Sequence, residues 1–405
     1  MKARAHRAPL LSRLVDGYEA PIDLALSAVS LDEEELEEVT VSLRAAARLV
    51  PAHGYAPLGI AALRSIIAER YSTNGIPTRP DEILITTGGQ SALSLIAATL
   101  LRSNDRVITE APTYPAAIEV FVRVGARVEG VERDHAGPIV SRVEQVLARG
   151  SARLIYVIPT SHNPTGAIMS ESRRLALLRT ARENRATVVE DAVLEDLALE
   201  RRPPPSLAAL EPDRVITVGS LSKTVWGGLR VGWIRAPGET ILRLGRVRAS
   251  LDLGSPVLEQ AAALKIFEHY DDLLVLRRAL VRERLAVLCQ GLRAQLPDWS
   301  FSEPNGGLSV WAELPRGSAD DLAQLALRRG VAIAAGRTRR AGRGVPLPRS
   351  AERWAGTHAP TRGDRAPCVG MGGTERNGRA LPSATRPRLK RICRTVPFAR
   401  RTRPR

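Results

Sequence analysis

The chain has 405 residues, an ordinary apolar content of 44%, three cysteines and a formal net charge of +16. A chain of this length can bury a sizeable core, in one large two-lobed domain or in two ordinary domains. Three cysteines give neither a disulfide framework nor metal-ligand spacing, so we expect no metal site. The sequence has no apolar run long enough for a membrane span and no signal-like segment behind its basic start, which together predict a cytoplasmic protein.

The positive charge is confined to residues 337–405, here called the basic tail. The basic tail carries 18 arginines and one lysine against three acidic residues, which is the whole excess of +16. The first 336 residues are therefore electrically balanced, and any affinity for nucleic acid belongs to the tail. The tail has few aromatic residues for base stacking and no recognisable reading module, so nucleic-acid binding is a weak alternative.

The N-terminal part predicts helices that flank a loop. Apolar residues recur at helical spacing in 31–50 and in 60–71, and the loop between these segments contains Tyr55. The composition of the first 20 residues is polar and basic, and no periodicity predicts an element there.

A predicted strand over 82–87 leads into Gly88 and Gly89 and then into a predicted helix over 92–101. Free backbone amides and the helix dipole at such a junction both favour an anion, so the unit suits a phosphate. Taken alone, an ordinary helix start is the commoner explanation of two glycines in this position.

Four apolar segments predict further strands, and a loop with polar side chains follows each of them. The predicted strands cover residues 106–110, 154–158, 186–190 and 214–218. Continuous apolar runs of this length are typical of a parallel sheet that is buried on both faces. The residues of interest in the four following loops are, in order, Tyr114, Asn163, Asp191 and Lys223.

The loop after the last of these strands predicts a cofactor. Ser220 and Ser222 precede Lys223, and Arg230 follows seven residues later. A lysine amine forms a Schiff base with a carbonyl when its surroundings keep it partly deprotonated, and a guanidinium grips two phosphate oxygens at once. An aldehyde combined with a phosphate indicates pyridoxal phosphate. The alternative for this stretch alone is an ordinary lysine on a solvated loop.

These motifs, in this order, resemble the class I/II aminotransferases, which have fold type I of the pyridoxal-phosphate enzymes. The closest resemblance is to the aminotransferase-like domain of MocR-type regulators in the GntR family, and it covers residues 9–336. It implies an α/β fold, with a mostly parallel sheet in a large lobe and a smaller α+β lobe. The implied limits are an N-terminal arm and the start of the small lobe in 1–50, the cofactor-binding lobe in 51–245, an incomplete small lobe in 246–336 and a disordered tail in 337–405.

The resemblance also implies which residues hold the cofactor. Its phosphate contacts match Gly89, Gln90, Ser220, Ser222 and Arg230, with Tyr55 reaching the phosphate of a partner subunit. Its ring contacts match Tyr114 for stacking, Asn163 for the phenolic oxygen and Asp191 for the pyridine nitrogen, and Lys223 is the attached lysine. Read alone, Tyr55 is equally explained as a packing tyrosine in a loop, and Tyr114 is better explained as a turn tyrosine. Many relatives have a tyrosine two or three residues after the aspartate that corresponds to Asp191, and that tyrosine also contacts the phenolic oxygen. This chain has Val193 and Leu194 at these positions instead.

The predicted function is that of a homodimeric aminotransferase, which moves an amino group between an amino acid and a 2-oxo acid. Lys223, once freed, acts as general base and then as general acid on the substrate proton. The rival hypothesis is the effector-sensing domain of a MocR-type regulator that has lost its winged-helix domain, with little or no turnover. The resemblance begins within the first ten residues and leaves no room for such a domain. An inactive fragment is a third hypothesis.

The family pattern stops at the basic tail, where apolar side chains become too sparse to offset the entropy of ordering. The family continues with a strand, an arginine that grips the substrate carboxylate and a final helix. No arginine of the tail lies in an apolar strand context, so we assign none to that role. We interpret the tail as the product of a shifted reading frame or a rearranged gene end, and expect cofactor binding with weak or absent transamination.

Overall fold

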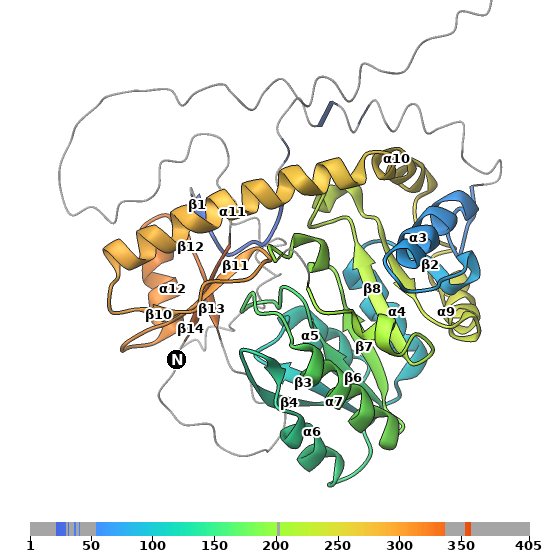
Figure 1. Ribbon diagram of the computed structural model, residues 1–405, viewed down its shortest axis with the longest axis horizontal. Helices are drawn as coiled ribbons and strands as arrows, with labels where there is room; N and C mark the ends of the chain where they lie inside the picture. The colour runs from blue at the N-terminus through green and yellow to red at the C-terminus, as the bar shows by residue number, and fades with distance from the viewer. Residues whose placement is uncertain are drawn as a thin grey trace, which may run out of the picture. The chain divides into compact units, whose positions relative to one another are not determined.

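The computed structural model describes residues 22–29, 31, 36, 37, 40, 54–200, 203–336 and 353–357, and its elements are labelled in Figure 1. The large lobe is built on an eight-stranded mixed sheet with the order β2-β9-β8-β7-β6-β3-β4-β5. β9 and β5 run against the other six strands. The strands are β2 (Ile83–Thr86), β3 (Arg106–Ala111), β4 (Arg127–Asp134), β5 (Gly137–Pro138), β6 (Leu154–Val157), β7 (Thr187–Asp191), β8 (Val215–Ser220) and β9 (Gly232–Arg235).

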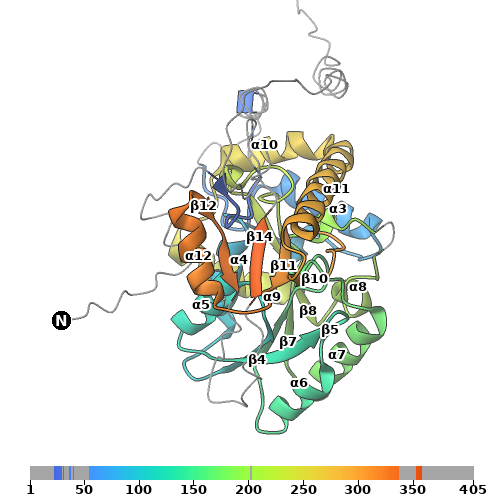
Figure 2. The ribbon, with the colours of Figure 1, turned by 90° about the vertical axis from the view of Figure 1, so that its left-hand side faces the viewer.

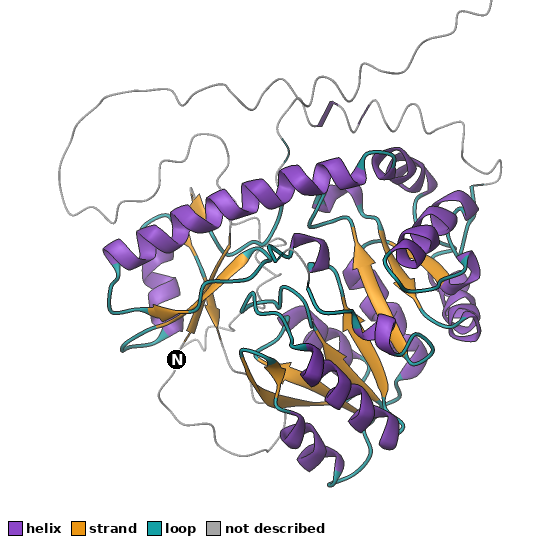
Figure 3. Cartoon of the chain, in the orientation of Figure 1, coloured by secondary structure: helices purple, strands orange, loops and turns teal. Residues whose placement is uncertain are grey.

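Helices cover both faces of this sheet, as Figure 3 shows in purple and orange. On one face, Leu154 and Tyr156 join a core that includes α4 (Gly89–Leu100), α5 (Pro115–Arg123) and α9 (Gly238–Leu251). On the other face, Ile155 and Val157 join a core with α6 (Val140–Leu147), α7 (Glu171–Glu183) and α8 (Leu207–Leu210). Because successive strand residues point to opposite faces, both sets must be apolar, which explains the continuous apolar runs.

A third core lies against β2 and β9. It contains residues of α3 (Ala61–Thr73) and α10 (Val257–Phe267), which pack on Ile83, Ile85 and Trp233. Short 3-10 turns η2 (Pro80–Glu82), η3 (Glu195–Leu197) and η4 (Gly227–Leu229) complete the connections of the large lobe.

The small lobe begins with the long helix α11 (Tyr270–Gln295), which Figure 2 shows beside β10, β11 and β14. A four-stranded sheet has the order β10-β11-β14-β13, and a separate parallel pair joins β1 to β12. Its core joins α11 residues, such as Leu285, to Val310 and Ala312 of β11. The remaining elements are β1 (Ile22–Asp23), β10 (Ser300–Phe301), β11 (Ser309–Glu313), α12 (Ala319–Arg328), β12 (Val331–Ala332), β13 (Ala334–Gly336) and β14 (Arg353–Thr357).

The predicted strands over 106–110, 154–158, 186–190 and 214–218 correspond to β3, β6, β7 and β8. The α/β fold with a mostly parallel sheet and a smaller α+β lobe is confirmed. Residues 331–336 form two strands and not one: β12 pairs with β1 and β13 pairs with β14, so the chain changes sheet at Ile333. The helical prediction for 31–50 falls almost wholly outside the described residues, and the four domain limits stay a prediction.

The basic tail was expected to have little stable structure, and this expectation is wrong for residues 353–357, which form β14. β14 pairs antiparallel with β11 and β13 and fills the position between them. Strand pairing uses backbone groups, and without a partner in this position both neighbouring strands would expose an open edge. The segment 353–357 has no proline, so it can supply a complete ladder although its composition gave no strand pattern. The rest of the tail lies outside the described residues.

Within the described part of the chain, no helix combines the length and the apolar character that a membrane crossing needs.

A buried arginine ties α7 to the loop that follows β6. The Arg174 side chain is fully buried, and its guanidinium donates to the carbonyls of Met169 and Pro159, at 3.0 Å each, and to Thr160 Oγ1 at 2.8 Å. Its Nη1 also lies 3.9 Å from the buried carboxylate of Glu190. Removal of the guanidinium takes away the donor to the buried Met169 carbonyl and the cation beside the buried Glu190 carboxylate, which is costly.

We predict that Arg174→Met lowers the free energy of unfolding by about 3 kcal/mol, because the apolar replacement satisfies none of these acceptors. Urea unfolding of the purified protein measures the change. Arg179→Met on the exposed face of the same helix is the matched control and should change stability by less than about 0.5 kcal/mol. Equal effects of the two substitutions would contradict the assignment.

Candidate functional site

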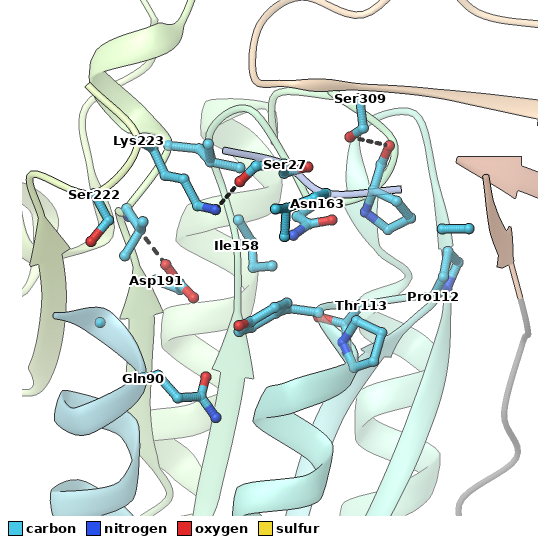
Figure 4. Close-up of a pocket in the computed structure, with 18 of the residues that line it drawn as sticks. Ser27, Gln90, Pro112, Thr113, Ile158, Asn163, Asp191, Ser222, Lys223 and Ser309 are labelled. Atoms are coloured by element: carbon cyan, nitrogen blue, oxygen red, sulfur yellow. Dashed lines mark hydrogen bonds between the residues drawn. The ribbon is translucent and has the colours of Figure 1, made fainter. Parts of the chain in front are cut away.

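One cavity lies at the carboxyl ends of the parallel strands and has a volume of about 320 Å³. Asp191, the last residue of β7, lies in its wall, and the loops after β6 and β8 contribute Asn163 and Lys223. Figure 4 shows these three side chains with Ser27, which comes from the N-terminal segment after β1. The predicted residues that line the cavity are Gly89, Gln90, Tyr114, Asn163, Asp191, Ser220, Ser222, Lys223 and Arg230.

The Lys223 loop is fixed by hydroxyl contacts at the end of β8. Ser220 Oγ lies 3.1 Å from the Val231 carbonyl and 3.0 Å from Ser222 Oγ, and it accepts the Ser222 amide at 3.2 Å. Lys223 Nζ donates to the backbone carbonyl of Ser27. The loop therefore presents one amine to the cavity from a braced backbone.

The electrostatics of the cavity favour a neutral lysine. Burial lowers the pKa of the Lys223 amine below its usual value. The Asp191 carboxylate opposes this shift, and the Arg230 guanidinium adds to it. A lysine that loses its proton more readily is a better nucleophile and a better base.

Asp191 is held by a donor on each of its oxygens. Tyr156 Oη donates to Oδ2 at 2.6 Å, and the Val193 amide donates to Oδ1 at 3.1 Å. Burial raises the pKa of the Asp191 carboxyl, while these two hydrogen bonds and Lys223 oppose the rise. The sequence analysis did not identify Tyr156. Its only signal there is a tyrosine inside an otherwise aliphatic strand.

At the predicted phosphate junction, the Arg230 side chain lies close to the backbone of Gly88 at the start of α4. Gly88 has φ 82°, and a Cβ in its place would lie 2.9 Å from Nη2 of Arg230. The α4 helix begins at Gly89 and has no acidic residue in its first turn. Arg230 itself has a left-handed backbone, with φ 54°, and its Nη2 donates to the Thr87 carbonyl at 2.5 Å. Helix amides and a guanidinium thus meet at the glycines, as an anion site requires.

Two polar atoms near this junction are buried without a hydrogen-bond partner among the described residues. They are Oε1 of Gln90 and Oγ1 of Thr113, and both residues line the cavity. Because buried polar groups are normally paired, such atoms indicate a place where a ligand completes the hydrogen bonding. Thr113 was not singled out from the sequence, although it directly precedes Tyr114.

Tyr114 lies at the start of α5 and lines the cavity. Burial and the charge of Asp191 raise the pKa of its phenol to about 12, so it stays neutral. Asn163 and Lys223 lie close to Ser27 in Figure 4. His162 has its side chain fully buried, with Nδ1 2.9 Å from Thr165 Oγ1, and it does not belong to the cavity lining.

Tyr55 is the one predicted site residue that the structure keeps apart from the others. Its side chain is 61% exposed and does not line the cavity. It precedes Ala56, which forms an isolated bridge with Gly254. This position fits the expectation that Tyr55 acts on a partner subunit, which stays a prediction.

The small lobe and the N-terminal segment contribute lining residues that the sequence analysis missed. They include Ser27, Ser309 and Trp311. Ser309 Oγ donates to the Pro164 carbonyl at 2.9 Å and so links β11 to the Asn163 loop. No local motif marks these residues, because each reaches the cavity only through the packing of remote segments.

The chain is similar to known proteins over most of its described length. The model of the family Aminotransferase class I and II matches residues 20–346. The 2-aminoadipate transaminase of Thermus thermophilus is 35% identical over 293 residues, which is 71% of each chain. The Aromatic-amino-acid aminotransferase 1 of Thermococcus litoralis is 32% identical and is matched over 70% of this chain and 69% of its own length.

Regulators are also among the relatives. The HTH-type transcriptional regulator YisV of Bacillus subtilis is 33% identical over 261 residues, which cover 63% of this chain but 54% of that protein. Among solved structures, the α-aminoadipate aminotransferase LysN of Thermus thermophilus, complexed with N-(5'-phosphopyridoxyl)-L-leucine, superposes with a TM-score of 0.78 at 31% identity. That match covers 87% of this chain and 90% of LysN.

We predict that Gly88→Ala weakens the binding of inorganic phosphate about tenfold, because the new Cβ both strains the left-handed backbone and displaces Arg230. The measurement is the rise in melting temperature that phosphate produces. Gly227→Ala is the control, since a Cβ there meets no atom within 4 Å. A wild-type phosphate response in the Gly88 variant would refute the proposed cradle.

Proposed function

The chain belongs to the class I and II aminotransferase family, and from this premise we propose that it is a pyridoxal-phosphate-dependent aminotransferase. Its reaction exchanges an amino group between an amino acid and a 2-oxo acid. The observation that carries the proposal is the meeting of Lys223, Asp191 and the Gly89–Arg230 junction in one cavity. Pyridoxal phosphate needs an amine for its aldehyde, a carboxylate for its ring nitrogen and an anion site for its phosphate, and each of these features provides one of them.

The residues around the junction suit the phosphate of the cofactor. The backbone amides at the start of α4 and the Arg230 guanidinium balance its charge. A side chain on Gly88 or Gly89 would fill the space, since a Cβ on Gly89 would lie 2.9 Å from Val193. Ser222 lines the same part of the cavity and has a hydroxyl to donate.

The opposite side of the cavity suits the ring. Asp191 has one protein donor on each oxygen and keeps acceptor capacity for a protonated ring nitrogen. Tyr114 offers a neutral aromatic face, and Asn163 a side-chain amide for the phenolic oxygen. The Val193 and Leu194 side chains offer no hydroxyl, so the hydrogen bond that many relatives make from this position is missing here.

The cofactor, when bound, supplies an electron sink for the carbanion that an amino acid forms on losing its α-proton. Lys223 is the residue that moves this proton. Its lowered pKa favours the unprotonated amine, which can accept the proton, and the hydrogen-bonded Lys223 loop holds the same atom in position to return it. The Ser27 carbonyl orients the amine before reaction.

The carboxylate of an amino-acid substrate needs a cationic partner in the cavity. Among the described residues, the cations that line the cavity are Lys223 and Arg230. Arg230 faces the phosphate junction, so neither serves the substrate carboxylate. The regulator alternative gains support here, because relatives such as YisV are named as HTH-type transcriptional regulators. Turnover of an amino acid and a 2-oxo acid by the purified chain distinguishes the two functions.

We also propose the cytoplasm as the location of the protein. The support is the cysteine usage: of three cysteines, Cys289 is buried and free, as is usual in a reducing compartment.

Replacement of the lysine tests the central assignment. We predict that Lys223→Ala abolishes covalent attachment of pyridoxal phosphate, detected by mass spectrometry after borohydride reduction. Any amino-transfer activity should fall by about 10²–10⁴-fold, the usual contribution of a general acid–base group. Lys265→Ala removes a lysine that pairs with Glu268 on the surface and should change neither property. Retention of the attached cofactor by Lys223→Ala would show that another group carries it.

We propose that the protein acts as a homodimer in which Tyr55 of one subunit serves the phosphate of the other. The surface around Tyr55 supports this, because the Ala56–Gly254 bridge lies between Tyr55 and the exposed leucines at the end of α9. Leu251 is 64% exposed and Leu253 is 47% exposed. Neighbouring exposed apolar side chains of this size mark interaction surfaces.

We predict that the chain sediments at micromolar concentration with about twice its mass of 43.9 kDa. Leu251→Asp should shift the protein to the monomer, since a charge in an apolar contact stays unpaired. Val275→Asp, at an exposed position of α11, should leave the dimer intact. A monomeric wild type with bound cofactor would refute the dimer.

A further inference from the structure

We infer that Tyr156 is a positioning residue for the reaction, whose hydroxyl orients the Asp191 carboxylate and holds it ionised toward the ring nitrogen of the cofactor. The inference rests on the proposed function, because the partner of Asp191 is that nitrogen. Tyr156 does not line the cavity, so its effect passes through Asp191.

The position of the two residues is set by the parallel pairing of β6 and β7. Tyr156 of β6 is in register with Val189 of β7, and Asp191 lies two residues after Val189 on β7. This offset lets Tyr156 Oη reach Oδ2 at 2.6 Å, a short distance that is typical of a hydroxyl donating to a charged oxygen. The Val193 amide holds the other oxygen at 3.1 Å, so the plane of the carboxylate is fixed from both sides.

The tyrosine itself has little freedom. Its side chain is fully buried, and its ring meets Phe121 edge-on, with 5.7 Å between the ring centres and 67° between their planes. Burial and the charge of Asp191 raise the pKa of the phenol well above its usual value. The phenol therefore keeps its proton at neutral pH and can donate it in a hydrogen bond.

The donor matters because the surroundings of Asp191 work against its charge. Burial raises the pKa of its carboxyl, and the groups that oppose this are Tyr156, the Val193 amide and the Lys223 amine. Lys223 is itself shifted toward its neutral form, which weakens its help. Tyr114, the remaining titratable group beside Asp191, is neutral. The Tyr156 hydroxyl is thus the main fixed side-chain donor that favours the ionised carboxylate.

A purely structural role is the competing explanation, since a buried tyrosine usually finds an acceptor. The two explanations differ in what depends on Asp191. A positioning residue affects cofactor affinity and turnover through the carboxylate, and its effect vanishes once the carboxylate is replaced. A structural residue affects stability whether or not the carboxylate is present.

The experiment measures Tyr156→Phe in the full chain, with pyridoxal phosphate affinity from absorbance titration and with steady-state kinetics where turnover is present. The substitution keeps the ring and its contact with Phe121. We expect affinity to fall about tenfold, as for loss of a hydrogen bond to a charged group, and kcat to fall about tenfold with KM changed less than twofold. Phe121→Leu, which alters the packing and spares the hydroxyl, should leave affinity within about twofold of wild type.

The decisive comparison adds Tyr156→Phe to Asp191→Asn. The tyrosine substitution should then change affinity by less than about twofold, because the carboxylate charge that the hydroxyl stabilises is gone. Two results would overturn the inference and leave the proposed function intact. One is a full tenfold loss of cofactor affinity when Tyr156→Phe is added to Asp191→Asn. The other is no loss of affinity when Tyr156→Phe is made in the protein that retains Asp191. Failure of the wild type to bind the cofactor overturns both.

Discussion

The parallel order of β6, β7 and β8 is the constraint on which the site depends. Their register brings Val157 beside Glu190 and Asp191 beside Val218, so the three carboxyl ends share one edge of the sheet. Loops that are about 30 residues apart in the chain therefore open into the same cavity. Ligands of open α/β sheets bind at this edge for the same reason.

Burial at that edge then determines the chemistry. The same loss of water lowers the pKa of Lys223 and raises the pKa of Asp191, which moves both groups toward their neutral forms. The protein opposes the shift at Asp191 with two hydrogen bonds but leaves Lys223 with a carbonyl acceptor. One cavity thus holds an amine whose pKa is lowered and a carboxylate whose charged form is favoured by two hydrogen bonds.

The small lobe is coupled to this chemistry through the residue after the lysine. Thr224 Oγ1 lies 2.9 Å from the Tyr270 hydroxyl, which donates to Asp196 at 2.9 Å. Arg277 of α11 donates to the Thr224 carbonyl at 3.0 Å. The first turns of α11 thus brace the Lys223 loop from behind, while Ser309 contacts the Asn163 loop from β11. A movement of the small lobe would therefore displace both the Lys223 loop and the Asn163 loop.

The sequence by itself predicted the four central strands of the large sheet from their apolar runs, and a cofactor from the lysine that follows two serines. The order of its motifs also resembles a known family, and that resemblance implied the fold class and the nine residues that share the cavity. Only the tertiary structure decided the partners of those residues. Tyr156 beside Asp191, Ser27 beside Lys223 and the place of β14 between β11 and β13 all join segments far apart in the chain. Such contacts depend on strand register and lobe packing, which no short stretch of residues encodes.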